Sequence, residues 1–99
     1  MDYKFRDPPI TACIVCSHVI NDNEPIEYVT HDDEDGVWQF ICGREEHDET
    51  HIKTRPLEHI TDLDPDVNSI ANLKLGQTAR RNLETKEWSI LDFNNDEVL

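Results

Sequence analysis

Cysteine and histidine are the residues of this 99-residue chain best suited to holding a metal ion, and it has three cysteines and five histidines. Cys13 and Cys16 have the C-x-x-C spacing of a zinc knuckle, which Cys42 and His47 would complete as a Cys3His site. A knuckle must turn sharply, but the two residues between Cys13 and Cys16 are stiff β-branched ones, and no Gly or Pro follows. On a straight strand Cys13 and Cys16 point to opposite faces, which argues against the knuckle.

A second set of four residues fits a zinc ion better. Cys16 and His18 are two residues apart, so on a strand they project from one face. Cys42 ends a neighbouring apolar segment, and His47 follows it in a polar loop. Two sulfur and two nitrogen ligands suit one Zn²⁺ ion. The alternative, two small buried cysteines and two ordinary surface histidines, stays open because these are not the spacings of a standard zinc finger.

Two other chemistries fit the sequence less well. A calcium loop with Gly36 at its sixth position would have His31 and Cys42 where an acid and a glutamate are needed. Cys42 could act as a nucleophile with His47 or His51 as its base, but the many nearby carboxylates would raise the pKa of the thiol. The chain also has no Gly-rich phosphate loop, serine elbow or dinucleotide fingerprint. We therefore expect a protein that is not an enzyme.

The charge of the chain is strongly negative, with 22 acidic and 9 basic residues and a formal net charge of -13. Such a surface repels nucleic acid and anionic lipid and attracts basic proteins and cations, although solubility alone would also account for it. Two acidic clusters are candidates for a partner-binding face. Their residues are Asp32, Asp33, Glu34, Asp35, Glu45, Glu46, Asp48 and Glu49. The basic pair Arg80-Arg81 either pairs internally with carboxylates or contacts an acidic group of a partner.

Cellular location can also be anticipated from the sequence. The first ten residues show no apolar stretch of the signal-peptide kind, and no segment approaches the roughly 20 apolar residues of a membrane helix. Three cysteines are an odd and sparse set for a disulfide scaffold. We expect a cytoplasmic protein with reduced cysteines and no membrane partner.

The first half of the chain has the alternation and turn residues of β-structure. Strands are expected over Ile10–Ile20, Ile26–His31 and Val37–Cys42, with an Asp-Gly hairpin turn at Asp32–Gly36 between the last two. One face of the third strand should be buried, and it carries Trp38, Phe40 and Cys42. Gly43–Thr50 is expected to be a polar loop.

The second half changes its period. Leu57 and Ile60 predict a short helix, and Asp64-Pro65 is a favourable start for another. Two further strands are expected over Thr78–Leu83 and Glu87–Ile90. The fold class is therefore α+β, a small, mainly antiparallel sheet with one or two short helices. Residues 1–99 should form a single domain, with a leader or edge segment at 1–9 and a frayed acidic tail at 92–99.

The order of several features resembles a family of small bacterial domains that includes immunity proteins of polymorphic-toxin systems. The matching features run from a β-branched opening strand through an acidic hairpin to an aromatic-rich strand and a basic residue. They are Ile14-Val15, Tyr28–Asp35, Gly36–Phe40, Cys42–Glu46, Asp62–Asp66, Gly76 and Arg80 or Arg81. The sequence departs from the family pattern at Val37, which separates Gly from Trp, and at Cys42, where a small residue is usual before Gly.

The resemblance implies a binding protein and supplies no catalytic residue. Together with the charge, it predicts a non-enzymatic acidic protein, such as an immunity protein, that binds and neutralises a toxin or another basic protein. The alternative is a small zinc-binding protein in which the Cys/His site is structural or regulatory.

Overall fold

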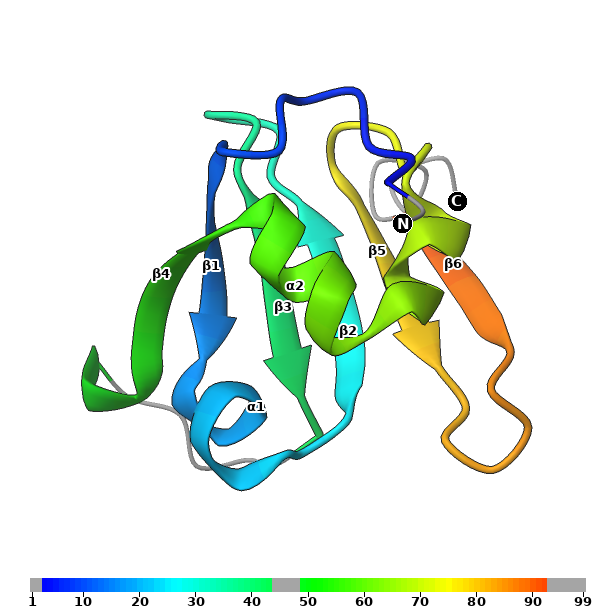
Figure 1. The fold of residues 1–99 in the computed structure, drawn as a ribbon. Coiled ribbons are helices and arrows are strands. Elements are labelled where there is room, and N and C mark those ends of the chain that lie inside the picture. The colour runs from blue at the N-terminus through cyan, green and yellow to red at the C-terminus, as the bar shows by residue number, and fades with distance from the viewer. Residues whose placement is uncertain (1–2, 44–48, 93–99) are drawn as a thin grey trace.

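One six-stranded sheet organises the chain in the computed structural model, which describes residues 3–43 and 49–92. Its strands in chain order are β1 (Ala12–Cys16), β2 (Ile26–His31), β3 (Trp38–Cys42), β4 (Ile52–Pro56), β5 (Gln77–Arg81) and β6 (Trp88–Asp92). In space they follow the order β4-β1-β3-β2-β5-β6 (Figure 1). Only β1 and β3 pair in parallel, and all other neighbours are antiparallel. The predicted α+β class with a mainly antiparallel sheet is confirmed.

Short helical segments complete the fold. They are α1 (Ser17–Asp22), η1 (Glu49–His51), α2 (Leu57–Leu63) and η2 (Pro65–Ile70). Figure 1 shows α2 and the turns that follow it lying across one face of the sheet. The helix predicted around Leu57 is present, and Asp64 caps the next segment by accepting a hydrogen bond from the Asp66 amide at 3.3 Å. That second segment is a 3₁₀ helix.

The predicted strand over Ile10–Ile20 is wrong in its second half. β1 ends at Cys16, where the backbone is still extended, and α1 begins at Ser17. The short helix stops at Asn23, whose left-handed φ of 56° suits asparagine. No strand was predicted over the residues of β4, an edge strand that pairs along its whole length with β1.

The hairpin between β2 and β3 forms as predicted. Gly36 takes the left-handed φ of 75° that the turn requires, and Asp32 accepts a hydrogen bond from the Glu34 amide at 2.8 Å. A register shift near the start of β2 interrupts its simple alternation, so that Ile26 and Val29 are both buried.

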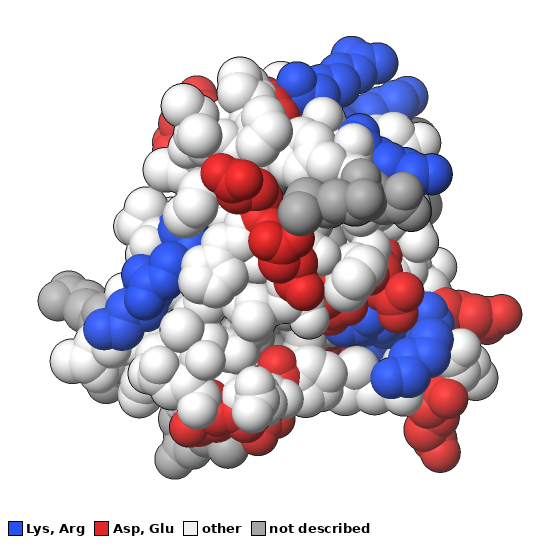
Figure 2. Space-filling view, viewed as in Figure 1, with Lys and Arg blue, Asp and Glu red and all other residues white. Residues whose placement is uncertain are grey.

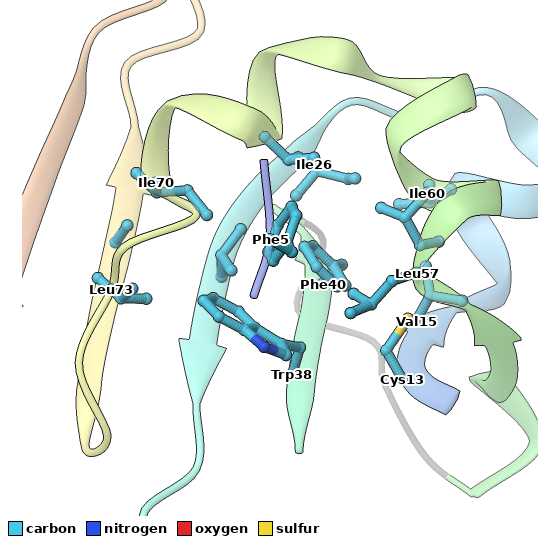
Figure 3. Packing of buried hydrophobic residues seen from close by; sticks show 14 of the residues in the cluster. Phe5, Cys13, Val15, Ile26, Trp38, Phe40, Leu57, Ile60, Ile70 and Leu73 are labelled. Carbon is cyan, nitrogen blue, oxygen red and sulfur yellow. The ribbon is translucent and has the colours of Figure 1, made fainter. Parts of the chain in front are cut away.

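The core lies between the sheet and α2 with η2 (Figure 3). As predicted, Trp38, Phe40 and Cys42 are buried. Residues 3–9, part of the expected leader or edge segment, belong to no strand, and they contribute the buried Phe5. The Phe5 ring meets that of Trp38 edge to face, with centroids 4.8 Å apart.

Arg81 is a buried cation that joins four segments of the fold, and its side chain is only 3% exposed. Its guanidinium donates to the carbonyl of Ile26 on β2 at 2.7 and 3.0 Å, and it pairs with Asp64 and Asp66 at the start of η2. The same group lies 4.8 Å from the ring centroid of Trp88 on β6. Arg81 therefore pairs internally, which was one of the two roles anticipated for the basic pair.

Replacing Arg81 with Met should lower the free energy of unfolding by about 3 kcal/mol, because Asp64 and the Ile26 carbonyl lose their donor. Urea unfolding followed by tryptophan fluorescence measures this change. Arg80→Ala is the control: that side chain is 59% exposed in its pair with Glu27, so its loss should cost less than about 1 kcal/mol. Equal losses for the two variants would show that Arg81 is not a structural centre.

Candidate metal centre

The ends of β1 and β3 bring two cysteines together. These strands are parallel neighbours, with Val15 beside Phe40, so their carboxyl ends lie at the same edge of the sheet. Cys16 is the last residue of β1 and Cys42 the last of β3. Both are buried, and the backbone amide of Cys42 donates a hydrogen bond to the sulfur of Cys16 at 3.3 Å.

His18 reaches this pair from a helix, which corrects the prediction that it shares a strand face with Cys16. The chain turns into α1 at Ser17, and Figure 1 shows α1 at the ends of β1 and β3. The His18 side chain is 6% exposed, and its Nδ1 lies 3.5 Å from the sulfur of Cys42. The helix α1, and not a continued strand, therefore places the imidazole of His18 beside the cysteines.

The three donor atoms of Cys16, His18 and Cys42 all lie within 4.8 Å of one another. In a tetrahedral zinc site, bond lengths of about 2.3 Å to sulfur and 2.0 Å to nitrogen put neighbouring donors roughly 3.5 to 3.8 Å apart. The 3.5 Å separation of His18 Nδ1 and Cys42 Sγ matches such an edge. The donor types of this group, and this one separation, therefore fit a zinc ion.

Of the four predicted ligands, the structure brings together three, and His47 lies outside the described residues. Another histidine, His51 at the end of η1, lies beside the group instead: its ring centroid is 4.7 Å from that of His18. His51 was considered from the sequence only as a catalytic base. The position of His51 follows from the pairing of β4 with β1, and local sequence patterns do not predict that pairing.

Cys13 stands apart from this group, although it lies three residues before Cys16. Its sulfur donates to the carbonyl of Arg55 at 3.1 Å, and the residue is buried in the core. Burial raises the pKa of the Cys13 thiol to about 12, so the thiol stays neutral and is a poor metal ligand.

The predicted partner-binding acids are only partly described. Glu45, Glu46 and Asp48 lie outside the described residues, as does the side chain of Glu49. In the hairpin, Asp32 and Asp35 accept hydrogen bonds from the amides of Glu34 and Val37. Asp33 and Glu34 are exposed. Figure 2 shows acidic side chains in several places on the visible face, with basic ones between them.

None of the helices in residues 3–43 and 49–92 has the length and apolar character needed to cross a membrane. Comparison of the chain with models of protein families, with curated proteins and with solved structures gives no match. The likeness to immunity proteins therefore stays an expectation from the sequence.

The raised pKa of Cys13 predicts a loss of stability in alkali. In the unfolded chain the thiol ionises near its ordinary pKa of about 9, whereas in the folded protein it stays neutral up to about 12. Its contribution is thus complete below about pH 9, and it declines by roughly 1.4 kcal/mol per pH unit above that, until about pH 12. Urea unfolding of wild type and Cys13→Ala across this range should give a shallower decline for the variant. Parallel declines would contradict the assignment.

Proposed function

We propose that this protein binds one zinc ion through Cys16, His18 and Cys42, and that the ion has a structural or regulatory role. The observation that carries the proposal is the meeting of three buried donor atoms within 4.8 Å of one another, supplied by β1, α1 and β3. Thiolate and imidazole together are a ligand set that zinc prefers.

Charge balance in the buried site also favours a divalent ion. Cys16 and Cys42 would bind as thiolates, and His18 as a neutral imidazole. Two thiolates offset the two positive charges of Zn²⁺, so the assembled group has no net charge to bury. Because its ligands come from a strand end, a helix and a second strand end, the ion would link these elements directly.

The burial of Cys42 supports a role other than catalysis. Its side chain is 1% exposed, and the nearby His18 is also buried. A nucleophilic cysteine must reach its substrate and needs a general base that can exchange protons with it. In this arrangement the sulfur and imidazole face each other inside the protein, which suits metal ligation better than attack on a substrate.

Protein purified without chelator should contain close to one equivalent of zinc per chain by elemental analysis. Cys16→Ser should lose most of this zinc and show a lower melting temperature, because a structural site contributes its binding free energy to folding. Cys13→Ser is the matched control: it changes a buried cysteine of the same strand but lies outside the donor group, so it should keep the zinc. Less than about a tenth of an equivalent in wild type would contradict a tight structural site.

A second proposal is that the protein binds a basic protein partner, such as a toxin, through exposed acids. It is favoured by the formal net charge of -13 and by the exposure of Asp33 and Glu34 at the tip of the β2–β3 hairpin. Neither side chain contributes to the two carboxylate hydrogen bonds that shape the turn. Attraction between such charges would speed association and would weaken as salt screens it.

Pull-down from the native host at low and high salt tests this second proposal. The variant Asp33→Asn with Glu34→Gln should recover less of a basic partner at low salt than wild type. Asp62→Asn with Glu84→Gln removes the same charge from exposed positions elsewhere and should recover as much as wild type. A partner held equally by both variants, or no partner at either salt, would count against a hairpin binding site.

A further inference from the structure

The pairing of β4 with β1 carries a histidine to the edge of the sheet where Cys16 lies. In this antiparallel ladder Ile52 is the partner of Cys16, and His51 immediately precedes Ile52 in the chain. The position of His51 is therefore set by the same hydrogen-bonded ladder that positions Cys16. It does not depend on the course of the chain between β3 and η1.

The side chain of His51 also lies toward the donor group. Its ring centroid is 4.7 Å from that of His18, and the planes of the two rings meet at 35°. His51 is half-buried, whereas His18 is buried. Its nitrogens do not belong to the group of donor atoms that lie within 4.8 Å, so ligation requires a rotation of the imidazole.

We propose that His51 is the fourth ligand of the metal centre, completing a Cys2His2 site with Cys16, His18 and Cys42. This inference rests on the proposed zinc binding and assigns a role to the site. Four protein ligands leave a tetrahedral zinc ion no open position for water or substrate, so the ion is structural and does not activate water. The ion then joins β1, α1, β3 and the segment leading into β4.

Cobalt substitution tests the ligand assignment, since Co²⁺ takes the place of zinc and its visible absorption reports coordination number and thiolate ligation. Wild type titrated with CoCl2 should show the intense bands of a four-coordinate ion. His51→Ala should shift these bands, because water takes the fourth position, and should bind zinc about 100-fold more weakly in competition with a chromophoric chelator. That is the upper end of the loss seen when even an outer-shell partner of a ligand is removed.

Three further variants separate direct ligation from other effects. His51→Cys should restore tight metal binding and strengthen the sulfur-to-cobalt charge-transfer band, which no packing role of His51 would do. It also decides the matter if His51→Ala does not fold by circular dichroism. His47→Ala should bind like wild type, as should His59→Ala, which changes a half-buried histidine on α2.

Different results identify which of the two proposals fails. Zinc affinity and cobalt spectra unchanged in His51→Ala, or lost in His47→Ala, would overturn the assignment of His51 while leaving zinc binding intact. Wild type that takes up neither Zn²⁺ nor Co²⁺ would overturn both proposals. A wild-type spectrum of five- or six-coordinate cobalt would overturn the closed site, because it requires water on the metal.

Discussion

The parallel pairing of β1 with β3 is the constraint on which the candidate site depends. Because the two strands run in the same direction, both end at the same edge of the sheet, and Cys16 and Cys42 are their final residues. An antiparallel pairing would have placed these sulfurs at opposite edges of the sheet. The antiparallel strand β4 then enters at this edge and brings His51 with it.

The other half of the sheet depends on a different interaction, the buried guanidinium of Arg81. It satisfies a carbonyl of β2, pairs with Asp64 at the start of η2 and stacks on Trp88 of β6. A buried cation is tolerated only with such complete pairing. Hence the two halves of the sheet carry different chemistry. Sulfur and imidazole groups meet at the ends of β1 and β3, and a charged hydrogen-bond network around Arg81 joins β2, η2, β5 and β6.

Sequence patterns predicted those parts of the fold that are decided locally. The β2–β3 hairpin followed from its Asp-Gly turn, and the buried face of β3 from the spacing of its aromatic residues. The strand-to-helix change at Ser17 was missed, because β-branched residues before it favour a strand and its outcome depends on tertiary packing. β4 was missed because it has no buried apolar face, since Ile52 is exposed, and because its partner lies about 40 residues away in the chain. For the same reason the sequence could group Cys16 with Cys42 but could not find His51.

The order of these residues along the chain has a consequence for synthesis. Cys16, His18, Cys42 and His51 all precede β5, whereas Arg81 is the last residue of that strand. A ribosome therefore releases every proposed ligand before it releases the guanidinium that organises the other half. Until β5 has emerged, β2 has an open edge in the growing chain, and β5 and β6 are the last strands that can pair onto the sheet.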